Sequence, residues 1–267
     1  MTPSERAPLT GACALALAAA MALPVYSGET LAGILALFVV LMCVSWPRLL
    51  ELPSRTGSAI IMALAGLGSL TLALIFGTTG LASKLVIVIA VSLFLSFAHE
   101  MLRRERSRLT LSISGTASGA LITTLTVIWL KCWSLASTNG PATVGFLLAM
   151  TMGLALGTLF LALPLPAAAR VSGAIALGAL TSGFLGWALH YPPSIIAMST
   201  LAGAVLCTAA LFVFFLLSRV IGASDPRQSL AVAIAPIALT GILALLFLEV
   251  ALSYVPADLG LTVIPTA

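Results

Sequence analysis

The chain has 267 residues, of which 61% are hydrophobic and only 7% are charged. Soluble domains carry roughly 25% charged residues, so this composition excludes a water-soluble fold and indicates an integral membrane protein. The formal net charge of +4 does not indicate nucleic-acid binding, because the basic residues are spread over short loops between apolar segments.

About nine membrane-spanning helices are expected along the chain. A bilayer core of about 30 Å needs about 20 helical residues, and glycine, proline and charged residues separate runs of this kind. In chain order the runs are Leu9–Pro24, Leu31–Trp46, Ser58–Phe76, Leu81–Ala98, Leu109–Leu130, Thr143–Leu163, Val171–Leu189, Ser194–Leu217 and Leu230–Leu252. The connections are too short for a second domain, so we expect a single all-α domain over residues 1–267, a polytopic transmembrane bundle.

The first run has a second interpretation. Arg6 precedes an alanine-rich stretch, which is also typical of a secretory signal. The second run follows after a short turn and can pair with the first as a hairpin, so we favour a retained span. Cleavage would leave eight spans in the same orientation.

The orientation is predicted from the arginines. Of the 12 Lys and Arg residues, all except Lys84 and Lys131 fall in loops on one side of the predicted bundle. Short cytoplasmic loops are rich in Lys and Arg, so this side is expected to be inside, together with the N-terminus. The tail from Pro256 is then outside.

A weak internal repeat relates residues 58–130 to 143–217. Gly68–Leu74 resembles Gly157–Leu163, and a second pair of similar stretches ends at His99 and at His190. An offset of three spans would make the two copies inverted, as in many transporters. Chance similarity between segments rich in Leu, Ala, Gly and Phe is the alternative.

Charged residues avoid the centre of every predicted span. An ionised group at the membrane midplane is costly and usually marks a site, so this distribution argues against a proton pump that uses buried carboxylates. Glu249 comes nearest, about 5 Å inside the outer end of the last run. It either pairs with Lys131 or His190 in a polar vestibule, or reaches the interface and ends the helix.

The fifth run has a polar face. Ser112, Thr116, Gly119, Thr123 and Thr126 recur at helical spacing. Small residues and hydroxyls on one face are typical of close helix packing, and they can also line a polar pathway. As a candidate substrate pathway, the sequence gives Ser112, Thr116, Thr123, Lys131, His190 and Glu249.

A second candidate site follows the fourth run, on the arginine-rich side. Glu100 and Arg104 have the stabilising i,i+4 spacing, and the surrounding arginines suit anionic lipid headgroups, a phosphorylated ligand or the acidic surface of a partner. The candidate docking residues are His99, Glu100, Arg103, Arg104, Arg106 and Arg108.

Three functions follow, in order of preference. The first is a permease-like protein or membrane subunit of an export system, handling an uncharged, amphipathic or lipid-like substrate. The second is a non-catalytic scaffold that binds other membrane subunits of a cell-envelope complex. The third, an intramembrane lipid-modifying enzyme, lacks a catalytic constellation, and no motif for a cofactor or metal is present. Arginine in place of lysine and abundant alanine indicate a bacterial cytoplasmic membrane.

Overall fold

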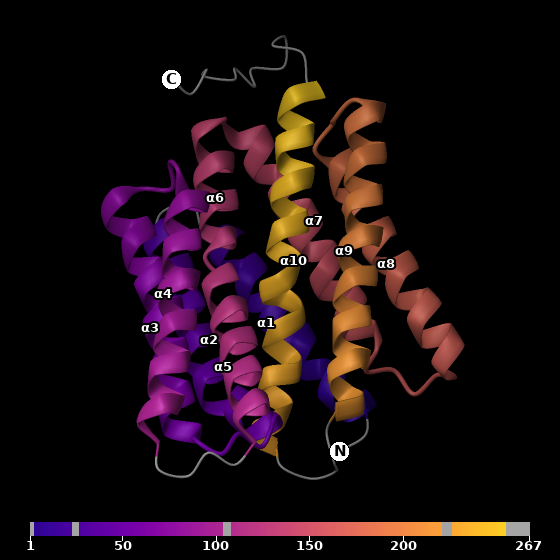
Figure 1. Ribbon diagram of the computed structural model, residues 1–267. Coiled ribbons are helices and arrows are strands. Elements are labelled where there is room, and N and C mark those ends of the chain that lie inside the picture. The colour runs from indigo at the N-terminus through magenta and orange to yellow at the C-terminus, as the bar shows by residue number, and fades with distance from the viewer. Residues whose placement is uncertain (1–2, 23–26, 104–107, 221–225, 255–267) are drawn as a thin grey trace.

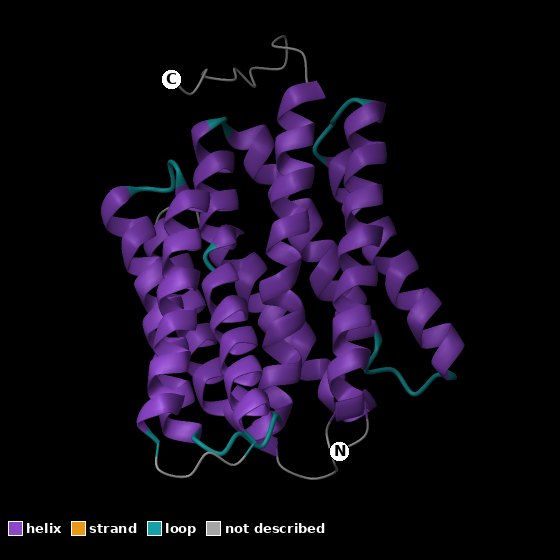
Figure 2. Cartoon of the chain, viewed as in Figure 1, coloured by secondary structure: helices purple, strands orange, loops and turns teal. Residues whose placement is uncertain are grey.

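Helices form every regular element in the computed structural model, which describes residues 3–22, 27–103, 108–220 and 226–254 (Figures 1 and 2). The expected tail from Pro256 lies outside these residues. In chain order the helices are α1 (Pro3–Ala22), α2 (Ser27–Leu49), α3 (Arg55–Phe76), α4 (Leu81–Leu102), α5 (Leu109–Leu125), α6 (Ile128–Thr138), α7 (Pro141–Phe160), α8 (Ala167–Ala188), α9 (Pro193–Val220) and α10 (Pro226–Tyr254). The prediction of an all-α polytopic bundle is confirmed.

Within the described residues, 8 segments are long and apolar enough to cross a membrane. Seven of these segments are the helices α2, α3, α4, α7, α8, α9 and α10, and the eighth is α5 followed by α6 over Leu109–Thr138. The first predicted run corresponds to a shorter apolar helix, Pro8–Ala22. Its side chains Leu17 and Met21 are buried in the bundle, so removal of α1 would uncover apolar surface on α7 and α10.

Two helices, α1 and α10, lie in the middle of the bundle. In Figure 1, α3, α4 and α5 lie on one side of α10, and α8 and α9 lie on the other. α10 packs against α1, α2, α5, α6, α7 and α9, and its stretch from Ala231 to Ala235 is buried all round. A helix that is apolar on every face is typical of a buried position or of a membrane span.

The outer helices α4 and α8 present large apolar side chains to their surroundings. Phe94 of α4 and Phe184 and Trp187 of α8 are each more than 60% exposed. Such surfaces are unstable in water and suit the hydrocarbon of a bilayer.

Small residues set the closest helix contacts. A Cβ added at Gly153 of α7 would overlap the Ser182 hydroxyl of α8, and one at Gly157 would overlap Cys207 of α9. The Ser182 hydroxyl donates to the Ala149 carbonyl across this contact, at 3.0 Å. The pair Gly153 and Gly157 therefore permits the close approach expected of a small-xxx-small pattern.

Candidate functional site

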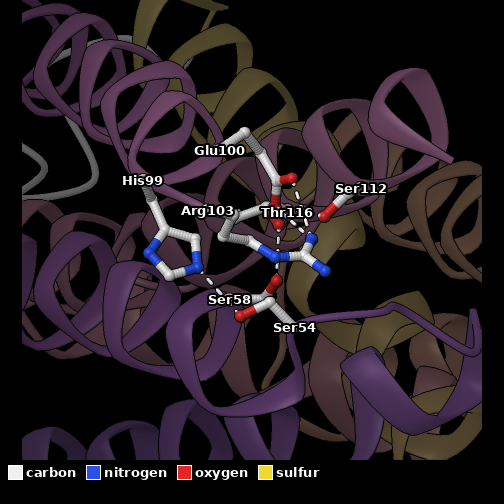
Figure 3. Close-up of polar contacts among 7 residues, drawn as sticks. All are labelled: Ser54, Ser58, His99, Glu100, Arg103, Ser112 and Thr116. Atoms are coloured by element: carbon white, nitrogen blue, oxygen red, sulfur yellow. Dashed lines mark hydrogen bonds and ion pairs between the residues drawn. The ribbon is translucent and has the colours of Figure 1, made fainter. Parts of the chain in front are cut away.

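A buried carboxylate occupies the arginine-rich end of the bundle, where α3 begins, α4 ends and α5 begins (Figure 3). Glu100 in the last turn of α4 is 2% exposed. Arg103 Nη1 lies 2.9 Å from Glu100 Oε2 and 3.2 Å from Oε1, and the Ser112 hydroxyl of α5 donates to Oε1 at 2.6 Å. A charge taken out of water needs such partners, so α4 and α5 are joined at this point.

Two further polar contacts connect the same helices. His99 Nε2 lies 2.8 Å from the hydroxyl of Ser54, which immediately precedes α3. The hydroxyls of Ser58 and Thr116 lie 2.7 Å apart, between α3 and α5. We call the seven residues in Figure 3 the polar cluster: Ser54, Ser58, His99, Glu100, Arg103, Ser112 and Thr116.

The polar cluster contains three of the predicted docking residues, in a different arrangement from the one expected. Glu100 pairs with Arg103, at i,i+3, and its burial removes it from any docking surface. His99 is partly buried against α3, whereas Arg108 is exposed. Arg104 and Arg106 lie outside the described residues. Sequence reasoning missed Ser54 and Ser58; the sequence Pro-Ser-Arg at the start of α3 is a helix-start signal that points to Ser54.

The predicted pathway face of α5 is filled by neighbouring helices. Ser112, Thr116 and Thr123 do share one face, and each is at most 3% exposed. Ser112 bonds to Glu100 and Thr116 to Ser58, and the Thr123 hydroxyl donates to the Met62 carbonyl at 3.1 Å. These hydroxyls therefore serve helix packing in this structure.

The other three predicted pathway residues lie toward the opposite end, which we call the Glu249 end. Glu249 and His190 are exposed, and Lys131 is partly exposed. Lys131 lies on α6 and Glu249 on α10, and these two helices pack against each other. Between described residues, no ion pair within 4.0 Å joins Lys131, His190 and Glu249. The structure thus separates these three residues from Ser112, Thr116 and Thr123, which lie on the buried face of α5.

His190 contributes to a pocket of about 180 Å³ at the Glu249 end. The pocket lies between the start of α7, the α8–α9 loop and the last turns of α10, and its lining includes Thr143, Phe146, His190, Tyr191 and Leu252. The Tyr191 hydroxyl donates to the Ala142 carbonyl, and burial raises the pKa of Tyr191 to about 12, so this hydroxyl stays protonated.

A larger apolar groove of about 480 Å³ adjoins this pocket, and the two share Leu189. We call it the α1–α7–α8 groove. It is lined by Leu15, Ala18, Ala19, Ala22, Gly145, Leu148, Ala149, Met152, Leu185 and Leu189. Half of these residues are alanine or glycine, and their small side chains create the recess.

No protein-family model, curated protein or solved structure matches the chain. Function is therefore inferred from the site geometry.

Proposed function

We propose that this integral membrane protein is permease-like, or is the membrane subunit of an export system, and that it handles an uncharged, amphipathic or lipid-like substrate in a bacterial cytoplasmic membrane. The observation that carries the proposal is a local irregularity near the middle of the fifth span, between α5 and α6, where amide bonds shift to i,i+3 partners while Thr126 and Val127 keep helical backbone angles. Interrupted helices at membrane depth are a feature of transporters, in which they border the substrate site.

Threonine hydroxyls bond back onto the backbone at this irregularity. The Thr126 hydroxyl donates to the Ile122 carbonyl at 3.1 Å, and Thr123 donates to Ala120 at 3.0 Å. Such back-bonding bends helices, and here the Val127 amide bonds three residues back, to Thr124, at 3.3 Å. The buried Thr124 hydroxyl has no hydrogen-bond partner among the residues that the structure describes.

The interrupted span contacts α10 beside a proline. Trp129 Nε1 donates to the Ile237 carbonyl at 2.8 Å, and Pro236 immediately precedes this residue. Proline removes one helical hydrogen bond from α10, so two irregular helices meet in the interior. The proposed inverted repeat, 58–130 and 143–217, would place its copies around α1 and α10, as carriers arrange theirs around a central site.

The test is lipid and amphipath movement in proteoliposomes. We expect the protein to accelerate transfer of a fluorescent phosphatidylglycerol analogue between leaflets, measured by dithionite quenching against protein-free vesicles. Trp129→Phe retains the ring and loses the bond to α10, and should change the transfer rate several-fold without loss of folded protein. Ser137→Ala, at an exposed site on α6, is the matched control.

The scaffold hypothesis is the second candidate. The occupied hydroxyls of Ser112, Thr116 and Thr123 and the exposed position of Glu249 favour it, because a scaffold needs no polar channel. If no transfer above the protein-free rate occurs for anionic, zwitterionic or uncharged analogues, the permease proposal is refuted and the scaffold hypothesis takes its place.

A further inference from the structure

The α1–α7–α8 groove lies within one half of the membrane thickness. Ala22 is the last residue of α1, Leu189 directly follows α8, and Gly145 lies one turn inside the start of α7. From there the groove extends to Leu15 and Met152. Seven helical residues rise about 10 Å, so the groove covers about a third of a 30 Å core, beginning at the Glu249 end. The groove therefore lies at the same depth in the membrane as the acyl chains of the leaflet on that side.

The chemistry of the lining selects an apolar occupant. All ten lining residues have apolar side chains or none, so a polar ligand would lose its hydration without gaining a hydrogen bond. A volume of about 480 Å³ falls within the range of small-molecule sites. In a membrane, lipid chains are the apolar molecules at this depth.

The smaller pocket, which adjoins the groove at Leu189, has polar side chains in its lining. A Cβ at Gly145 would overlap the Tyr191 hydroxyl and Leu189, so the missing side chain lets these two residues pack directly on α7 where the groove adjoins the smaller pocket. The Tyr191 hydroxyl donates to the Ala142 carbonyl, and the Thr143 hydroxyl donates to the Asn139 carbonyl, so neither hydroxyl is free to donate to a ligand. The exposed imidazole of His190 has no hydrogen bond to another described residue, and it lines the pocket at the level where a lipid changes from chain to headgroup.

From this arrangement we infer that the groove binds one acyl chain of a membrane phospholipid from the leaflet at the Glu249 end, with the polar part of the lipid at His190. The small residues Ala18, Ala19, Ala22 and Ala149 provide the space, and His190 supplies the hydrogen bond. The site stands independently of transport; only its role as a substrate site rests on the proposed function.

Photocrosslinking in proteoliposomes tests this inference. The vesicles contain phosphatidylethanolamine and phosphatidylglycerol, with a small fraction of phosphatidylglycerol that carries a diazirine within one acyl chain. After irradiation, mass spectrometry should locate adducts on the groove-lining parts of α1, α7 and α8. Ala19→Phe fills the groove from an exposed position, so folding is retained, and it should reduce these adducts several-fold. Ala12→Phe, at an exposed site on the same helix outside the groove, should leave them unchanged.

The outcomes separate this inference from the proposed function. Adducts spread evenly over exposed side chains such as Ile87 and Phe94 of α4, or unaffected by Ala19→Phe, would overturn the lipid site even if lipid transfer is observed. Groove adducts that Ala19→Phe removes, in a protein without transfer activity, would support the lipid site and refute the permease. His190→Ala should weaken retention of the lipid with little effect on the position of chain adducts; unchanged retention would remove His190 from the site.

Discussion

At the scale of single residues, the central question is how the membrane protein tolerates the buried Glu100. Its carboxylate accepts hydrogen bonds from Arg103 and Ser112, and both partners lie within one turn of a helix end. Burial of an ion pair stabilises little by itself, yet removal of one partner leaves an uncompensated charge, at a cost of about 3 kcal/mol or more. The polar cluster therefore holds α3, α4 and α5 in one specific arrangement.

Single and paired substitutions at Glu100 and Arg103 distinguish these contributions. Arg103→Leu should destabilise the protein by about 3 kcal/mol, whereas the double variant Glu100→Leu, Arg103→Leu should lose less, because no charge remains buried. Thermal unfolding in detergent measures both. If the double variant unfolds at a lower temperature than Arg103→Leu alone, Glu100 stabilises the fold even without Arg103, and the explanation by an uncompensated charge is wrong.

The burial of Glu100 could not be predicted from the sequence. Its distance from the span centre is typical of an interfacial residue, and the same sequence is compatible with pairing to Arg103 or Arg104. Burial is decided by α3 and α5, which cover the end of α4, and a single sequence does not reveal which helices are neighbours.

At the scale of helices, most of the spans were predictable because the bilayer imposes their length and composition. The shared face of Ser112, Thr116 and Thr123 was equally predictable, since the spacing alone determines it. The partners of this face were not predictable, because small residues and hydroxyls suit both a packed contact and a polar pathway. The break after Leu125 was also missed, as no glycine or proline marks it.

Glycine substitutions test the packed contact of α5. A Cβ at Gly119 would overlap the side chains of Met62 and Trp46, and the Trp46 indole is held by its 2.9 Å hydrogen bond to the Gly115 carbonyl. Gly119→Ala should therefore destabilise the protein by about 1–3 kcal/mol. Gly68→Ala in α3 is the matched control, because nothing lies within 4 Å of a Cβ there, and it should be neutral or stabilising. Equal unfolding temperatures for the two variants would contradict close packing at Gly119.

At the scale of the whole molecule, the two ends differ in charge. Arg55, Arg108 and Arg219 are exposed at one end, and Glu29 and Glu249 are exposed at the other. Positively charged loops are retained in the cytoplasm and attract anionic headgroups, so we expect the arginine-rich end to be inside. With that orientation, the α1–α7–α8 groove opens to the outer leaflet, and Glu100 lies at the cytoplasmic boundary.

Cysteine accessibility measures this orientation directly. In a background in which the 4 native cysteines are replaced by alanine, Thr56→Cys places a thiol beside exposed Arg55, and Ser137→Cys places one at the far end of α6. A membrane-impermeant maleimide should label Ser137→Cys in intact spheroplasts, and Thr56→Cys only after the membrane is opened. Labelling of Thr56→Cys in intact cells would put the arginines outside, against the usual charge rule. The groove would then face the cytoplasmic leaflet, and its lipid would be drawn from that leaflet, the side from which an exporter takes its substrate.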